Sequence, residues 1–343
     1  MAESICLIPK LHGVGGPSSF QGRLKTGLEQ QGFIVHFDPD RKDTTVILVI
    51  AGTRHMLKLS HAKRRGVRIV QRLNGMNWTH RKTNTGLRHY VRAEVNNWIL
   101  ATIRRALASE IVYQSHFTND WWNKQYGEVH SPSRVIWNGV ELDMFSPKGT
   151  SDRPNDRIRI QVTEGHLGGG HELGLRNAIR FAQALKPCLR QPLEMIVAGD
   201  VPPVLLREFA HLEWIRWLGV IDLSQIPRLN RSAHLYFPCE INAACPNSVI
   251  EAMACGLPVI GYQTGAILEL VGEEGGKVVR YGAKDTELEQ AVVEPLVQGA
   301  LDILEHWEKY SQSARKRAET LFDVNEMVEK YITAMGIANP SQP

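Results

Sequence analysis

Short apolar runs alternate with helical stretches along this 343-residue chain. Ser4–Ile8 and residues 46–51 read as strands buried on both faces, as expected of central strands in a parallel sheet. Between them a glycine-rich turn at 13–16 leads into a helix over 18–31. A strand, a glycine turn and a helix form the opening unit of a nucleotide-binding α/β domain. Further strands are predicted at 67–71, 111–114 and 135–137, with helices at 55–65, 87–107 and 116–125.

The same alternation resumes after residues 147–156, where proline, glycine, serine and charged residues cluster without an apolar period. Such a stretch is typical of a linker. We therefore predict an α/β protein of two doubly wound domains, with the site in the cleft between them. The predicted parts are residues 1–148, 157–320 and a terminal helical part over 321–336. The strands predicted for the second domain are 158–162, 193–198, 214–218, 235–237, 259–262 and 277–279.

Residues 234–271 of the second domain combine strands and a short helix with turn residues at each joint. The helix opens at Asn247, Ser248 and Val249, after a proline and before a glycine. Its amino end presents backbone N–H groups and suits a phosphate or diphosphate. Glu251, one turn further on, is placed to accept a hydrogen bond from a ligand hydroxyl. Together these features suit a nucleotide, with phosphates at the helix end and ribose beside it.

The segment PNSVIEAMACGLPVI, with Gly265-Ala266 and Glu269, resembles the donor-site signature of the retaining GT-B glycosyltransferases of family 4, which are group 1 glycosyltransferases. A second segment, WNGVELDMFSP at 137–147, resembles the one that closes their first domain. The resemblance implies a GT-B fold, in which two Rossmann-like domains face a central cleft and helix 324–335 crosses back onto the first domain. It also implies that the chain uses a nucleoside-diphosphate sugar and needs neither a metal nor another cofactor.

The resemblance assigns roles to single residues. Glu251 matches the glutamate that holds the ribose of the sugar nucleotide, and Gly265 and Ala266 match the donor-binding turn that follows. Gly15 and Gly16 match a Gly-Gly loop that approaches the donor phosphate and the acceptor. The resemblance therefore predicts a donor site that draws on both domains.

Other positions depart from the family's pattern. A first glutamate, which in the family contacts the donor sugar, is replaced by Ala243, and Glu240 or Asn242 on the same loop are candidates to take its place. On the acceptor side, related enzymes often carry a histidine after a strand of the first domain. This sequence has Arg72 and Asn74 in that region, so no histidine carries over.

Two cations of the family are also missing. The family's Gly-Arg-Leu and Lys-Gly appear here as Gly165-His166-Leu167 and Leu173-Gly174. His166 is only partly protonated at neutral pH. Arg176 lies three positions after Leu173 on the same helix face and is the other candidate to stabilise the leaving phosphate. An ordinary surface arginine at this position is the equally open interpretation.

The charge is unevenly divided along the chain. Residues 1–150 hold 21 Lys+Arg against 11 Asp+Glu, a net of +10, and the remainder holds 19 against 25, a net of −6. A basic half suggests an anionic partner, and we expect an anionic membrane surface. Simple solvated surface explains part of this charge equally well. Nucleic acid is not expected, because the chain shows no recognisable reader module.

The cysteines and the amino terminus indicate the compartment. Five cysteines form no C-x-x-C pair, so neither a disulfide framework nor a zinc site is expected. The first residues lack the basic start of a signal peptide, and no apolar run is long enough to span a bilayer. We expect a cytoplasmic protein, attached peripherally at the inner face of the membrane.

Two functions follow from these residues. The first is a retaining transferase of the hexosyltransferase type that moves a sugar to a lipid-linked or polysaccharide acceptor. The second is a catalytically degenerate GT-B protein that binds a sugar nucleotide, or protein partners, without turnover. The donor-binding residues favour the first function, and the lost family positions favour the second. A sugar-nucleotide epimerase of the same architecture is a more remote alternative.

Overall fold

The chain folds into two compact units, each built on a six-stranded parallel sheet. Unit 1 consists of Met1–Gly139 and Val324–Pro343, and unit 2 of Val140–Asp323. The computed structural model describes residues 3–13, 15–168 and 172–338. Every strand pairing within the two sheets is parallel, which confirms the predicted α/β class.

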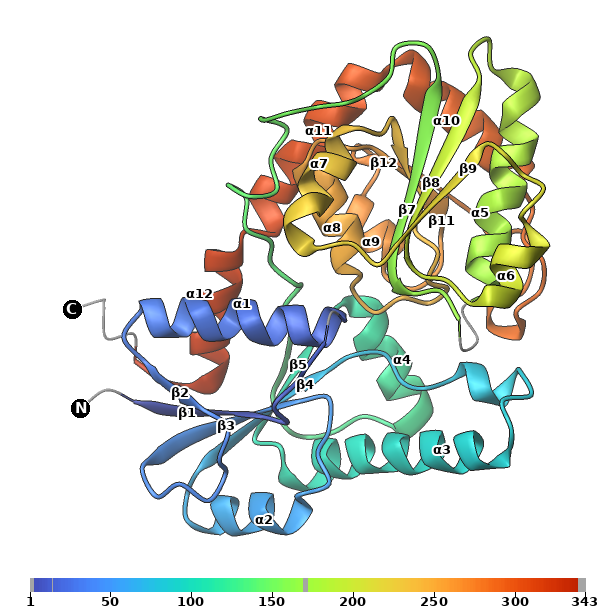
Figure 1. The fold of residues 1–343 in the computed structure, drawn as a ribbon. Helices are drawn as coiled ribbons and strands as arrows, with labels where there is room; N and C mark the ends of the chain where they lie inside the picture. The colour runs from blue at the N-terminus through green and yellow to red at the C-terminus, as the bar shows by residue number, and fades with distance from the viewer. Residues whose placement is uncertain (1–2, 14, 169–171, 339–343) are drawn as a thin grey trace. The chain divides into compact units, whose positions relative to one another are not determined.

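In unit 1 the sheet has the order β2-β1-β3-β4-β5-β6. Helices α1 and α12 cover one face of this sheet, and α2 and α3 cover the other (Figure 1). The elements are β1 (Ser4–Ile8), α1 (Gly16–Gln30), β2 (Ile34–His36), β3 (Thr44–Ile50), α2 (Met56–Arg64), β4 (Arg68–Leu73), α3 (Leu87–Thr102), β5 (Glu110–Tyr113), α4 (His116–Tyr126), β6 (Ser133–Val135) and α12 (Val324–Met335).

Helix α12 belongs to the core of unit 1 although it lies at the end of the chain. The rings of Phe20 in α1 and Tyr331 in α12 are 5.2 Å apart, centroid to centroid. A Cβ added to Gly27 would lie only 2.5 Å from a methyl carbon of Val328, so this glycine lets the two helices approach closely. Buried apolar side chains from β1, β3 and β4 complete this side of the core.

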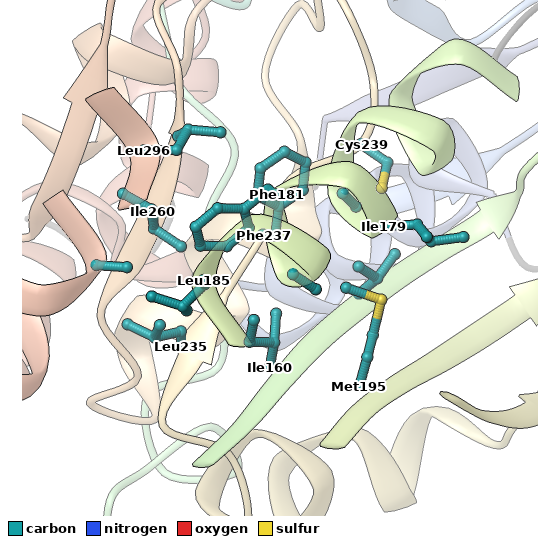
Figure 2. Packing of buried hydrophobic residues seen from close by; sticks show 14 of the residues in the cluster. Ile160, Ile179, Phe181, Leu185, Met195, Leu235, Phe237, Cys239, Ile260 and Leu296 are labelled. Atoms are coloured by element: carbon teal, nitrogen blue, oxygen red, sulfur yellow. The ribbon is translucent and has the colours of Figure 1, made fainter. Parts of the chain in front are cut away.

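In unit 2 the sheet has the order β12-β11-β10-β7-β8-β9. Its core includes Phe181 of α5, which stacks on Phe237 with ring centroids 5.6 Å apart (Figure 2). The elements are β7 (Ile158–His166), α5 (Glu172–Leu185), β8 (Leu193–Asp200), α6 (Pro203–Glu208), β9 (Ile215–Gly219), α7 (Ile226–Arg231), β10 (Leu235–Tyr236), α8 (Asn247–Ala254), β11 (Val259–Tyr262), α9 (Ile267–Val271), β12 (Gly276–Val279), α10 (Glu294–Glu305) and α11 (Trp307–Leu321).

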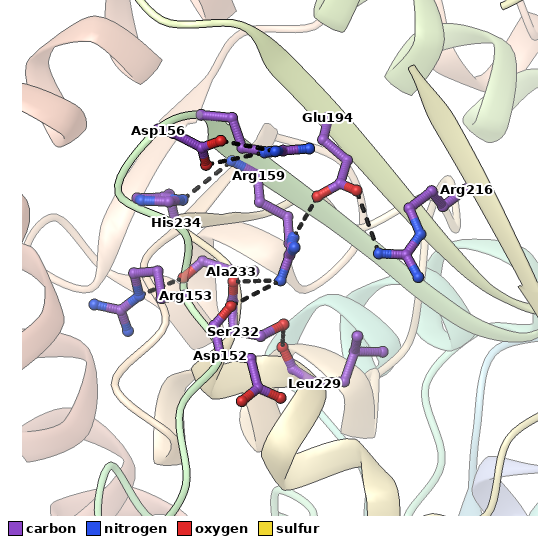
Figure 3. A network of polar contacts seen from close by, with 11 residues as sticks. Asp152, Arg153, Asp156, Arg159, Glu194, Arg216, Leu229, Ser232, Ala233 and His234 are labelled. Atoms are coloured by element: carbon purple, nitrogen blue, oxygen red, sulfur yellow. Dashed lines mark hydrogen bonds and ion pairs between the residues drawn. The ribbon is translucent and has the colours of Figure 1, made fainter. Parts of the chain in front are cut away.

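A polar network fixes the start of β7 to its neighbours (Figure 3). The Arg159 side chain donates to Glu194 Oε2 at 2.7 Å, and the Arg159 backbone N–H donates to His234 Nδ1 at 3.0 Å. Burial, followed by the positive charges of Arg153 and Arg159, lowers the pKa of His234 to about 4. The imidazole is therefore neutral at physiological pH and serves as a hydrogen-bond acceptor inside the fold.

The boundary between the units lies between Gly139 and Val140, not at residue 148 as predicted. Val140 N–H donates to Phe322 O at 2.8 Å, and Arg315 Nη1 donates to Phe145 O at 2.7 Å. Both bonds hold the segment after residue 139 to unit 2. The stretch 147–156 contains no helix or strand, as a linker should, but it also lies within unit 2.

Two helical predictions also change. The helix predicted over 87–107 ends as an α-helix at Thr102 and continues as π-helix over Ile103–Leu107. The terminal helical part predicted over 321–336 contains the single helix α12, and two further helices, α10 and α11, precede it. Among the helices of the described residues, none is both long enough and apolar enough to cross a membrane.

Candidate functional site

Two loops of unit 2 are joined beside the carboxyl end of its sheet. Gly265 N–H donates to Asn242 Oδ1 at 3.1 Å, and Ala266 N–H donates to Ala243 O at 2.9 Å. Gly265 has φ +56°, and a Cβ there would lie 2.4 Å from Ala243 O. Only glycine fits a left-handed position this close to another backbone. The loop that carries the predicted sugar contacts is thus fixed to the predicted donor turn.

Helix α8 follows the first of these loops. Pro246, at its N-cap, has no side-chain oxygen to accept from the first N–H groups of the helix. Asn247 and Ser248 at this end are partly exposed, whereas Val249 is buried. Glu251 is also buried, with 6% of its surface exposed. The four residues that the sequence predicted for this end of the site therefore lie within one and a half turns of a single helix. Their roles remain predictions.

The sheet order shows where a ligand would bind in unit 2. Strand β7 is the first in the unit and lies between β8, the next strand, and β10, which follows a crossover. In such sheets ligands bind outside the carboxyl ends of the two strands at which the order reverses. Here these ends are Glu164–His166 of β7 and the Cys239-Glu240 segment that follows β10. The loop of α8 and the end of β7 therefore meet at one site.

Glu164 is a residue of this site that sequence reasoning missed. Its carboxylate oxygen Oε1 accepts from Cys239 N–H at 3.4 Å. Burial, followed by the negative charges of Glu240 and Glu251, raises the pKa of Glu164 to about 8. Like charges and low solvent access both disfavour a carboxylate. At neutral pH the Glu164 side chain is thus largely a neutral acid that is able to donate a hydrogen bond.

Replacing Glu164 with glutamine is expected to stabilise the protein progressively more as the pH rises from about 5 to about 8. The folded pKa lies above the ordinary value of 4.5. Over this range the folded state binds more protons than the unfolded state, so the free energy of unfolding of the wild type falls with pH. The neutral amide avoids this loss, which is on the order of a few kcal/mol. Urea unfolding at several pH values measures it, and a pH-independent difference between variant and wild type would contradict the prediction.

The two residues predicted to replace the family's cations both contact carboxylates. His166 Nδ1 lies 2.8 Å from Asp200 Oδ2, and both side chains are exposed. Arg176 forms an ion pair with Glu208 of α6, and its guanidinium also lies over the ring of Phe209. Asp200 and Glu208 therefore orient the two predicted cations. A role for either cation at a phosphate remains a prediction.

In unit 1 the predicted glycine turn leads directly into α1. Gly15 is the N-cap of this helix, and its carbonyl accepts from Ser18 and Ser19 N–H. The buried Gln21 holds the preceding loop, because it accepts from Leu11 N–H and donates to Pro9 O, each at 2.8 Å. Gly15 and Gly16 thus start a helix whose N-cap has no side chain. Gln21 thus fixes Pro9 and Leu11 ahead of this helix, and residue 14 of the predicted glycine turn lies outside the described residues. Phosphate binding by Gly15 and Gly16 remains a prediction.

Of the two residues predicted on the acceptor side, Arg72 lies near the end of β4 and Asn74 follows that strand. Arg72 is 1% exposed; its guanidinium lies 3.6 Å from the ring centroid of Phe20 and donates to Asn138 Oδ1 at 2.8 Å. Asn74 O accepts from Trp122 Nε1 at 2.8 Å. These contacts show Arg72 and Asn74 supporting the carboxyl end of β4. Contact with an acceptor is untested.

No cluster of three or more His, Cys, Asp or Glu side chains within the described residues has the arrangement of a metal site. The cysteines at 6, 188, 239, 245 and 255 are free thiols. Burial raises the pKa of the Cys239 thiol well above its ordinary value, and the adjacent Glu164 adds to the shift. This cysteine acts as a small buried side chain and not as a reactive thiolate.

Residues 169–297 match the family "Glycosyl transferases group 1". One polypeptide of the human phosphatidylinositol N-acetylglucosaminyltransferase is 25% identical over 147 residues. That match takes in 40% of this chain but only 28% of the human protein.

Solved structures resemble nearly the whole chain. Sucrose-phosphate synthase from Thermosynechococcus elongatus has a TM-score of 0.74 at 16% identity, over 96% of this chain and 98% of that protein. Anabaena HepE, solved with UDP and glucose, has a TM-score of 0.69 at 15% identity, over 97% and 99%. WaaG, a glycosyltransferase of lipopolysaccharide biosynthesis, has a TM-score of 0.69 at 14% identity, over 98% and 99%. The GT-B fold inferred from the sequence is thus confirmed, and residues 169–297 are similar to the group 1 glycosyltransferases.

Proposed function

We propose that the protein is a retaining glycosyltransferase that moves a hexosyl group from a nucleoside-diphosphate sugar to a lipid-linked or polysaccharide acceptor. The observation that carries this proposal is the site of unit 2, where Glu251 lies one turn from the amino end of α8. The carboxylate of Glu251 would hold the ribose. The N–H groups at the start of α8 would face the diphosphate.

The similar proteins favour a uridine nucleotide. Anabaena HepE was solved with UDP-glucose, and the pneumococcal O-GlcNAc transferase GtfA with UDP and GlcNAc. The human relative is named for transfer of N-acetylglucosamine. These names support a UDP-sugar as the first donor to test, ahead of GDP-, ADP- and TDP-sugars.

Transfer requires stabilisation of the charge that develops on the leaving diphosphate. The amino end of α8 supplies typically ~0.3–1 kcal/mol, and up to ~2 kcal/mol, for such a charge. A neutral Glu164 would add a hydrogen-bond donor and would avoid repelling the diphosphate. His166 and Arg176 would contribute further charge if the bound donor drew them from Asp200 and Glu208. We propose this set in place of the family's Arg and Lys.

The decisive experiment incubates the protein with the panel of nucleoside-diphosphate sugars and measures both binding and release of free diphosphate. A transferase is expected to bind one donor and to hydrolyse it slowly, with faster release when its acceptor is present. NMR of the first-formed sugar would show the anomeric configuration of the donor if the reaction is retaining. Binding without release for every donor and acceptor would instead support the degenerate protein.

The proposal includes a location at the cytoplasmic face of an anionic membrane. The supporting observation is the basic first half of the chain, with its net charge of +10 over residues 1–150. A lipid-linked acceptor is confined to such a surface, so attachment would raise the local concentration of acceptor around the enzyme. Lys and Arg near an anionic bilayer contribute roughly 1 kcal/mol each.

A further inference from the structure

Helix α3 of unit 1 exposes a continuous apolar stripe. The exposed fractions are 80% for Leu87, 51% for Val91, 45% for Val95 and 64% for Trp98. These residues are spaced four, four and three positions apart, so they lie one above another along a single face of the helix. Soluble helices normally turn such a stripe toward the core.

The opposite face of α3 is the one that packs on unit 1. Ala93, Asn97 and Leu100 are buried there. Asn97 also fixes the helix to the preceding loop, because it accepts from Asn77 N–H at 3.0 Å and donates to Asn77 O at 2.7 Å. The orientation of α3 is therefore set by buried contacts. The apolar stripe defined by Leu87, Val91, Val95 and Trp98 points outward because of them.

The surroundings of the stripe are strongly basic. Residues 51–107 contain 13 Lys+Arg and a single acidic residue, Glu94. Glu94 is engaged by Arg81 at 2.6 Å and by His80 at 2.8 Å, and the Arg81 hydrogen bond is the main cause that lowers the pKa of Glu94 to about 2. In contrast, Arg88 and Arg92, which lie beside the stripe, form no ion pair within the described residues.

Helix α2 extends this surface. It lies on the same face of the sheet as α3, and side chains of both helices share one buried cluster (Figure 1). Leu57 of α2 is 78% exposed, and Lys63 and Arg64 are exposed near its end. Lys63 Nζ donates to Ala106 O at 3.0 Å, which ties the end of α2 to the segment after α3.

We propose that α3 docks flat on the surface of an anionic phospholipid bilayer, with the stripe in the apolar boundary and its arginines on the headgroup phosphates. This inference rests on the proposed function, in which the acceptor is lipid-linked, and it names helix α3 as the element that binds the membrane. An apolar stripe containing Trp and Leu, flanked by Arg, is the composition of helices that lie in the interface.

Charge complementarity selects this occupant over a second copy of the chain. A two-fold dimer through the stripe would bring two strongly basic surfaces together, since residues 51–107 of each copy contain one acid and 13 Lys+Arg, of which only Arg72 and Arg104 are buried. The negative surface of a bilayer attracts the same residues. Self-association of the stripe is nevertheless an outcome that the experiment detects.

The experiment measures sedimentation of the full chain with vesicles of phosphatidylcholine alone and with phosphatidylglycerol added. Wild type is expected to bind only the anionic vesicles, and less so as salt is raised from about 0.05 M to about 0.5 M. Removing two charges in Arg88→Gln/Arg92→Gln should weaken binding roughly 30-fold. The matched control Lys186→Gln/Arg190→Gln, at exposed positions of unit 2, removes the same charge and should bind as wild type does.

A second pair of variants tests insertion of the stripe. Leu87→Ser/Trp98→Ser should weaken binding roughly tenfold or more, whereas Val204→Ser, at an exposed apolar position of α6, should not. Brominated lipids should quench the fluorescence of Trp98, and the quenching should be lost in Trp98→Phe. Absence of vesicle binding, equal binding to neutral vesicles, or a dimer that the stripe variants dissociate would each overturn the proposal.

Donor hydrolysis in solution, measured on the same variants, separates this inference from the proposed function. Undiminished donor hydrolysis by a protein that does not bind vesicles would overturn only the proposal that α3 docks on the membrane. Vesicle binding by a protein that releases no diphosphate from any donor would overturn only the proposed transferase function.

Discussion

Replacing Glu251 with glutamine is expected to weaken binding of the nucleoside-diphosphate donor by about 10- to 100-fold. The substitution keeps the volume of this buried side chain but removes the charge that would accept from the ribose hydroxyls. A hydrogen bond to a charged group contributes about 1.5–3 kcal/mol, roughly twice a neutral one. Calorimetric titration with the donor selected from the panel measures the loss.

Deoxyribose analogues of the donor nucleotide make this prediction specific. If Glu251 holds the ribose, the wild type should bind the analogue lacking the contacted hydroxyl more weakly, and the glutamine variant should discriminate less. Glu305→Gln, at an exposed position of α10 in the same unit, is the control and should leave affinity unchanged. Equal discrimination by wild type and Glu251→Gln would show that this carboxylate does not contact the ribose.

The alternation of buried strands and helices was sufficient to predict the α/β class and the two sheets. The location of the unit boundary was not predictable in this way. Residues 140–146 look like the end of the first domain, but a backbone hydrogen bond from Val140 to Phe322 places them with unit 2. That bond joins positions far apart in sequence, and no local composition signals it.

Sequence reasoning located the parts of the site that depend on backbone geometry. Gly265 is required by its positive φ and its close neighbour, so the residue type itself carries the signal. Glu164, Asp200 and Glu208 were missed because their importance depends on which strands and helices are adjacent. The available signal was a polar residue near the end of an apolar strand, as in the Thr163-Glu164 pair in the last part of β7. It becomes specific only when the order of the strands is known.

The apolar period of α3 was also visible in the sequence, but its direction was not. A stripe at helical spacing usually marks the buried face. In α3 the buried face contains Ala93, Asn97, Ile99 and Leu100, whereas Leu87, Val91, Val95 and Trp98 face outward. Small and amide side chains suit a close approach to the sheet and the preceding loop. This reversal is what makes the surface of α3 informative about a partner.

Replacing Gly174 with alanine is expected to lower the free energy of unfolding by about 2–4 kcal/mol and to weaken donor binding. Gly174 lies in the first turn of α5, and a Cβ there would lie 1.7 Å from Cys239 O and 2.7 Å from Cys239 C. These are backbone atoms, so the loop that carries Glu240 must move away from α5. The hydrogen bond from Cys239 N–H to Glu164 would be disturbed by the same movement.

Gly22→Ala is the matched control, since Gly22 is also in a helix, is exposed, and has no atom within 4 Å of the added Cβ. There alanine should raise stability by about 0.5–1 kcal/mol, because it reduces the backbone entropy lost on folding. Denaturant unfolding of the two variants should give changes in the free energy of unfolding of opposite sign. Donor titration should show weaker binding for Gly174→Ala and not for Gly22→Ala. If Gly174→Ala were as stable as Gly22→Ala and bound the donor normally, the close contact between α5 and the Cys239 loop would not be what positions the site. The loss of affinity in Gly174→Ala would instead place the donor against that loop, next to the glutamate that β7 contributes.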